Sequence, residues 1–192
     1  MAIHPKKGKL LYHLTSIENL SQIFKNGLRA RNKLTKFDNI ADPEIIKHRK
    51  KHNLNHLIPF HFFPGTPFAG KVQMDNPEQS FVYITVKRKI AEDRKYKIIT
   101  QHPLSMDPPI LLSYKKGIKR INWELMGKRD YNDQTCKLHC MAECLSKKAV
   151  MPKDFHSVYC SNESDSRIAT SLKLNIKING LYINVKPEMF KT

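Results

Sequence analysis

The sequence predicts one mixed α+β domain spanning residues 1–192. The length of 192 residues suits a single sizeable core and is short for two full domains. Apolar residues recur at helical spacing in the first fifty residues, whereas later stretches such as SFVYITVK at 80–87 alternate and are rich in β-branched and aromatic residues. We therefore expect helices early in the chain and mostly strands later.

The first helix follows a short strand predicted at Leu10 to Tyr12. Thr15 or Ser16 can cap this helix, because a side-chain hydroxyl accepts a hydrogen bond from a free N–H group of the first turn. Gly27 should end it, since glycine adopts a positive φ without strain. Its predicted apolar face consists of Ile17, Leu20, Ile23 and Phe24.

The later elements are predicted in order. Residues 29–42 are polar and irregular, and Pro43 opens a strongly basic helix to Lys51. Three prolines and two glycines make PGTPFAGKVQMDNPEQ, residues 64–79, a predicted loop. Strands are predicted at 56–63, 80–87, 96–100, 141–146, 156–160 and, around an Asn179-Gly180 turn, at 172–185.

The chain is strongly basic, with 34 Lys and Arg against 17 Asp and Glu and a formal net charge of +17. Because this charge is spread along the chain, a folded surface could follow a phosphate backbone, which makes a polyanionic partner the natural expectation. A basic protein without such a partner is the alternative. Residues 115–129, KKGIKRINWELMGKR, are the segment most suited to phosphate. Aromatic platforms for bases could come from Tyr83, Tyr96, Tyr114, Trp123 and Tyr131, each of which could instead belong to the core.

The sequence contains neither a long apolar run nor a signal-peptide pattern, so we expect a cytoplasmic protein without a membrane segment. Cys136, Cys140 and Cys144 are spaced by four, which would place them on one face of a single helix. This row, with Cys160, matches no common zinc pattern even with His139 nearby. We therefore predict buried reduced thiols and no metal site.

Four pieces of sequence follow one another in fixed order, namely YHLTSIENLSQIFKNGL, IADPEIIKHRKKH, LIPFHFFPGTPF and HCMAECLSKKAVMP. Together they resemble the DarT family of bacterial toxins, which use NAD+ to ADP-ribosylate DNA bases. The resemblance covers roughly residues 10–160 and rests on order and spacing as well as on single residues. It implies a single-domain ADP-ribosyltransferase-like fold with central mixed β-sheets and flanking helices.

The resemblance assigns the NAD+ pocket to residues of the first piece, with NAD+ as co-substrate. A His-x-Thr turn offers a ring nitrogen, a hydroxyl and free backbone N–H groups, all able to hold parts of a dinucleotide. Without the resemblance, Thr15 would be a helix cap and His13 an ordinary packed or exposed residue. The residues implied to bind NAD+ are His13, Thr15, Asn19, Gly27, Leu28 and Arg49.

By resemblance, Arg49 also contributes to the reaction centre, although its run of cations could equally be a solvated helix face. Two groups of neighbouring cations are predicted to contact nucleic-acid phosphates, Lys47, Lys50 and Lys51 in one and Lys119 and Arg120 in the other.

Glu143 resembles the catalytic glutamate of the family. Cleavage of NAD+ at the nicotinamide builds oxocarbenium-like positive charge on the ribose, which a nearby carboxylate stabilises. The attacking base nitrogen must also lose a proton, which the same carboxylate can accept. Read alone, a single Glu in an apolar stretch would more often be a residue of a half-exposed strand.

The segment PGTPFAG departs from the family pattern, in which many members carry an arginine in this proline turn. Gly65-Thr66 stands there instead. If the turn helps to select the base, the identity of the base does not carry over from the better-known members that modify thymine. Guanine is the base we favour over thymine. The implied partners are single-stranded DNA and a macrodomain antitoxin, and the enzyme is expected to be a monomer. The alternatives are a non-catalytic nucleic-acid-binding module and an ADP-ribosyltransferase that acts on RNA or protein.

Overall fold

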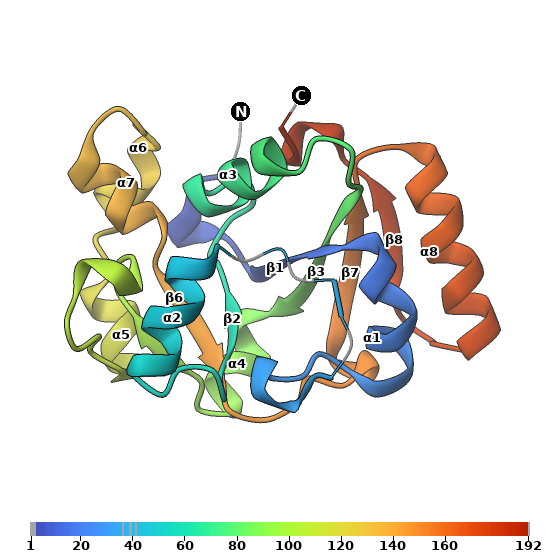
Figure 1. The fold of residues 1–192 in the computed structure, drawn as a ribbon, viewed down its shortest axis with the longest axis horizontal. Helices are drawn as coiled ribbons and strands as arrows, with labels where there is room; N and C mark the ends of the chain where they lie inside the picture. The colour runs from blue at the N-terminus through green and yellow to red at the C-terminus, as the bar shows by residue number, and fades with distance from the viewer. Residues whose placement is uncertain (1–2, 36, 39, 41, 192) are drawn as a thin grey trace.

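The computed structural model describes residues 3–35, 37, 38, 40 and 42–191, which form two four-stranded sheets flanked by helices (Figure 1). One sheet has the strand order β1-β3-β7-β8 and the other β2-β6-β4-β5. The strands are β1 Leu10–Ser16, β2 Ile58–Phe60, β3 Phe81–Lys87, β4 Lys97–Ile99, β5 Leu112–Ser113, β6 Glu143–Ser146, β7 Phe155–Cys160 and β8 Tyr182–Val185.

The two sheets meet at a backbone bridge between Tyr12 and His61. The N–H of Tyr12 donates to the carbonyl of His61 at 2.9 Å, and the N–H of His61 donates to the carbonyl of Tyr12 at 2.8 Å. Among the described residues, the strands within each sheet pair antiparallel except β7 with β8, which pair in parallel. The bridge brings the middle of β1 close to the end of β2, where the predicted site residues lie.

Helices cover the sheets from several sides. Helix α8 packs on α1, β7 and β8 at one edge of the molecule, whereas α5, α6 and α7 lie at the opposite edge (Figure 1). The α-helices are α1 Leu20–Asn26, α2 Pro43–Lys51, α3 Pro67–Asp75, α4 Arg88–Asp93, α5 Tyr114–Arg120, α6 Trp123–Lys128, α7 Gln134–Cys140 and α8 Glu163–Ile176.

The predicted α+β class is confirmed, and so are several elements. Helix α2 begins at Pro43, where the side chain of Asp42 caps it by accepting a hydrogen bond from the N–H of Glu44 at 2.8 Å. Strands β3, β4, β6 and β7 lie within one or two residues of their predicted positions. Gly27 ends α1 with a φ of 77°, as its residue type predicts.

The start of the first helix differs in detail from the prediction. Strand β1 continues to Ser16, so Thr15 belongs to the strand and does not cap the helix. Ser16 caps a short 3-10 turn, Ile17–Asn19, through a hydrogen bond that its hydroxyl oxygen accepts from the N–H of Glu18 at 3.2 Å. The chain therefore turns directly from a strand into helix α1.

The predicted loop at 64–79 is wrong, because helix α3 occupies most of it. The Thr66 hydroxyl accepts a hydrogen bond from the N–H of Ala69 at 3.3 Å, and Pro67 takes the first helical position, where its missing N–H costs nothing. Ala69 and Val72 are buried on the inner face. The prolines counted as loop formers thus serve in part as a helix start.

The predicted hairpin at 172–185 is also wrong. Asn162 caps helix α8, and the acidic residues Glu163 and Asp165 stabilise its first turn. The helix then continues to Ile176 through most of the segment LKLNIKI, residues 172–178. β8 then pairs in parallel with β7, so Gly180 does not form a hairpin turn. Helices α5 to α8 also make the second half of the chain more helical than predicted.

The cysteine row does not lie on one helix, because α7 ends at Cys140 and Cys144 lies on β6. All four cysteines are buried and free, and burial raises the pKa of the Cys144 thiol. The prediction of an aromatic platform for bases is wrong for Tyr83, Tyr96 and Tyr114, because these three side chains are buried in the core. Trp123 and Tyr131 pack partly against the same core.

Candidate active site

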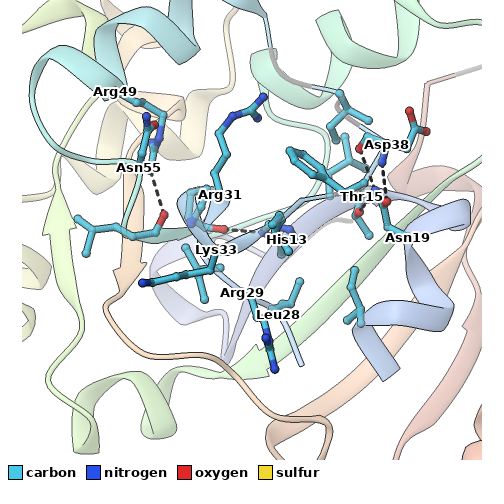
Figure 2. Close-up of a pocket in the computed structure, with 18 of the residues that line it drawn as sticks. His13, Thr15, Asn19, Leu28, Arg29, Arg31, Lys33, Asp38, Arg49 and Asn55 are labelled. Atoms are coloured by element: carbon cyan, nitrogen blue, oxygen red, sulfur yellow. Dashed lines mark hydrogen bonds between the residues drawn. The ribbon is translucent and has the colours of Figure 1, made fainter. Parts of the chain in front are cut away.

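A cavity of about 480 Å³ opens between β1, α1, α2 and the ends of β2 and β6. Figure 2 shows Arg49 and Asn55 at one side of it, Thr15, Asn19 and Asp38 at the other, and His13 between them. Every residue predicted to bind NAD+ and the predicted catalytic pair line this cavity, namely His13, Thr15, Asn19, Gly27, Leu28, Arg49 and Glu143. The fold therefore brings together residues that are far apart in the sequence.

His13 is held in one orientation on β1. Its Nδ1 lies 2.8 Å from the carbonyl oxygen of Pro59, which can only accept, so Nδ1 carries the proton and Nε2 keeps a free lone pair. Burial lowers the pKa of His13 to about 4, because the buried ring disfavours a charge. The ring is therefore neutral near pH 7.

Asn19 lines the cavity, and its carboxamide is hydrogen-bonded to two neighbouring residues. Its Nδ2 donates to the Thr15 hydroxyl at 3.2 Å and to the Asp38 carbonyl at 2.9 Å, and its Oδ1 accepts from the Asp38 N–H at 2.8 Å. The Asp38 carboxylate also accepts a hydrogen bond from Gln79. Asn19 thus holds Asp38, another cavity residue, against β1.

Gly27 and Leu28 form a tight corner of the cavity wall. Backbone hydrogen bonds of 2.9 Å in both directions join Leu28 to Val150. A Cβ atom on Gly27 would lie 2.7 Å from the Val150 carbonyl oxygen, and the φ of 77° would strain any side chain. Glycine is therefore needed here for the close approach of two backbones.

Arg49 and Glu143 form a buried ion pair. The Nη1 group of Arg49 donates to Glu143 Oε1 at 3.0 Å and to Oε2 at 2.7 Å, with side-chain exposures of 10% and 9%. The Nη2 group lies 3.4 Å from the carbonyl oxygens of Leu54 and Leu57. The guanidinium is thus occupied by Glu143 and the α2–β2 connection, which fixes the direction of the carboxylate.

Several cavity residues were not anticipated from the sequence. His61 and His102 line it near Glu143, and burial lowers the pKa of both. Three cations also line it, Arg29, Arg31 and Lys33, and they follow Gly27 as an alternating basic run. The alternating basic run could have indicated from the sequence that these cations line the cavity. Nothing in the local sequence distinguishes the two histidines from other buried histidines.

The predicted phosphate-binding residues lie outside the cavity lining. Lys47, Lys50 and Lys51 are exposed on α2, whose buried Arg49 faces the cavity, and Lys51 forms an ion pair with Asp107 at 2.6 Å. Lys119 and Arg120 are exposed at the end of α5. Both groups are accessible to a polyanion, and neither belongs to the Arg49–Glu143 cluster.

The arrangement combines three chemical capacities in one cavity. A carboxylate fixed by a guanidinium can stabilise positive charge and accept a proton. Neutral imidazoles offer lone pairs, and the cations can hold phosphates. Among residues 3–35, 37, 38, 40 and 42–191, no group of three His, Cys, Asp or Glu is placed to hold a metal ion, and no helix is long and apolar enough to cross a membrane.

Several solved structures are similar to this chain, among them the following three. The chain superimposes on Thermus sp. 2.9 DarT in complex with ADP-ribosylated ssDNA with a TM-score of 0.84 and 14% identity, covering 96% of this chain and 97% of that one. For the same protein in complex with NAD+, the TM-score is 0.78 and the identity 13%, and the match covers 96% of this chain and 98% of that one. The match to Thermosipho africanus DarTG in complex with ADP-ribose has a TM-score of 0.76 and 19% identity, and it covers 95% of this chain and 51% of that one.

At these identities the structural matches show that the folds are alike. No curated protein sequence matches significantly. A family model described as "ssDNA thymidine ADP-ribosyltransferase, DarT" matches residues 12–191, which is nearly the whole chain. The chain therefore belongs to the DarT family of single-stranded DNA ADP-ribosyltransferases.

Proposed function

We propose that this chain transfers ADP-ribose from NAD+ to a base in single-stranded DNA, with Glu143 as the catalytic residue. The observation that carries the proposal is the placement of the Arg49–Glu143 pair in the same cavity as His13 and Thr15 of strand β1. A dinucleotide bound along β1 and α1 would then bring its nicotinamide–ribose bond to the carboxylate. Arg29, Arg31 and Lys33 are suited to its diphosphate.

The reaction breaks the bond between the ribose C1′ and the nicotinamide nitrogen and forms a bond between C1′ and a nitrogen of the base. Glu143 stabilises the positive charge that develops on the ribose and accepts the proton that the base nitrogen loses. Nicotinamide leaves with the electron pair of the broken bond. Arg49 directs the carboxylate into the cavity through its two contacts.

We further propose guanine as the preferred base, where the family description names thymidine. The support from the sequence is the Gly65-Thr66 segment in place of the arginine-containing turn. Lys47, Lys50, Lys51, Lys119 and Arg120 would hold the DNA backbone. We also propose a cytoplasmic monomer that acts as the toxin of a pair whose antitoxin is a macrodomain protein.

The test incubates the purified chain with labelled NAD+ and single-stranded oligonucleotides that together contain all four bases. Mass spectrometry of the released nucleosides should identify a base that carries ADP-ribose. Label on RNA or on protein alone would redirect the proposal to another acceptor. Salt-sensitive DNA binding without NAD+ turnover on any acceptor would instead identify a non-catalytic binding module.

A further inference from the structure

His61 and Glu143 are neighbours across two paired strands. The antiparallel register of β2 with β6 ends at the pair of Phe60 and Cys144, and continuing it by one residue beyond the end of β2 sets His61 opposite Glu143. Residues directly opposite one another on antiparallel strands project to the same face. Both side chains line the cavity, in agreement with this geometry.

The His61 ring is fixed in one tautomer. Its Nδ1 lies 3.2 Å from the carbonyl oxygen of Ala142, the residue before Glu143. Since a carbonyl oxygen can only accept, Nδ1 carries the proton and Nε2 is left as a bare acceptor. Burial lowers the pKa of His61. The negative charge of Glu143 opposes this effect and the positive charge of Arg49 reinforces it, so the ring is neutral near pH 7.

We infer that Glu143 and His61 Nε2 form a pair of neighbouring hydrogen-bond acceptors that reads the edge of the acceptor base and selects guanine. This inference rests on the proposed transfer to DNA and names the residue that decides the base. Guanine carries two adjacent donors on its Watson–Crick edge, the ring N1–H and the exocyclic N2 amine. One donor faces the carboxylate, and the other donates to His61.

The other bases do not complement two adjacent acceptors. Thymine has a single ring N–H between two carbonyl groups, so one carbonyl oxygen would face the lone pair of His61. Adenine and cytosine each carry one amine next to a bare ring nitrogen, which would face one of the two acceptors. A buried acceptor left without a donor disfavours the wrong base, as in other sites built around one hydrogen-bond pattern. The expected preference for guanine over thymine is about 10- to 100-fold.

The first test measures base preference in the unaltered chain. Oligodeoxycytidine strands that carry one guanine, one thymine or one adenine are incubated with NAD+, and the ADP-ribosylated nucleosides are quantified by mass spectrometry. Guanine should react at least about tenfold faster than thymine. Equal rates, or a faster reaction of thymine, would overturn the inference and the guanine preference proposed above, and would leave the proposed transfer of ADP-ribose to DNA intact. No modification of any base would overturn both.

The second test removes the acceptor. His61→Phe keeps an aromatic ring without a lone pair, so its guanine-to-thymine ratio of kcat/KM should fall to about one. His61→Gln, whose amide oxygen is an acceptor, should restore part of the ratio. The matched control is His156→Phe, because His156 lies on β7 outside the cavity and its ring packs on Tyr182. This control should keep the ratio of the unaltered chain.

The variants are compared after circular dichroism has verified that each is folded. A ratio that stays unchanged in both His61 variants would overturn the role of His61. If His61→Phe does not fold, the ratio of His61→Gln and the base preference of the unaltered chain decide the question. A general loss of activity at a constant ratio would indicate that His61 is only structural.

Discussion

Arg49 on α2 and Glu143 at the start of β6 are 94 residues apart in sequence and form an ion pair of 2.7 Å inside the protein. Removing two charges from water is costly, so a buried pair is weak evidence for stabilisation. The pair is better explained by function, because it orients the carboxylate that the proposed reaction needs. Through this pair, a residue of the first half of the chain fixes the orientation of a side chain of the second half.

The carboxylate of Glu143 should be essential for transfer. Glu143→Gln keeps the shape of the side chain but cannot accept a proton, so labelled transfer should fall by at least about 1000-fold. Affinity for NAD+, measured by calorimetry, should change much less. Glu124→Gln on the exposed face of α6 is the matched control and should keep full activity. Transfer above about a tenth of the normal rate would argue against a catalytic Glu143.

The ion pair should show a characteristic pattern in stability. Arg49→Met leaves the buried Glu143 charge without its partner, so urea unfolding should reveal a loss of about 3–5 kcal/mol. The double variant Arg49→Met/Glu143→Leu removes both charges and should regain at least half of that loss while remaining inactive. Losses that simply add in the double variant would contradict a direct pair.

Asn19 should act on co-substrate binding through Asp38. Asn19→Ala removes the hydrogen bond to Thr15 and the two hydrogen bonds that hold Asp38 at the cavity, so KM for NAD+ should rise about tenfold with a smaller change in kcat. Steady-state kinetics provides the measurement. Asn175→Ala on exposed α8 serves as the control. A fall in kcat at constant KM would place Asn19 at the chemical step instead.

His13 should make stability depend on pH. Its pKa is about 4 in the fold and about 6.5 when unfolded, so between these values the unfolded chain binds more protons and stability falls as the pH falls. The effect of this one residue is at most about 3 kcal/mol between pH 7 and pH 4. Urea unfolding at several pH values should show a shallower dependence in His13→Gln, and an unchanged slope would contradict a neutral His13.

The exposed cations should contribute to the salt dependence of DNA binding. Replacing Lys47 or Lys50 by Ala should reduce the slope of log K against log salt by about 0.7 per lost phosphate contact. Lys51→Ala should have a smaller effect, because Lys51 already pairs with Asp107. Fluorescence anisotropy of a labelled oligonucleotide gives the slopes. Arg167→Ala on α8, at the far edge in Figure 1, should leave the slope unchanged.

The sequence by itself determined the local features of this protein. Pro43 and Gly27 mark a helix start and a helix end through their own backbone preferences, and alternating β-branched residues make 81–87 a strand. The excess of positive charge and the order of four short motifs were also visible without coordinates. Local signals failed at α3 and α8, where a capping residue upstream decided the conformation of an ambiguous stretch.

Only the tertiary structure decided which residues of the site contact one another. The Arg49–Glu143 pair, the contact of His61 with Ala142 and the engagement of Asn19 by Asp38 each join separate segments. Their geometry depends on the register of β2 against β6 and on the bridge between Tyr12 and His61. A shift of one residue in that register would turn His61 or Glu143 away from the cavity, and no local preference encodes such a choice. Long-range strand pairing is therefore the physical reason that residues predicted one by one become a single site.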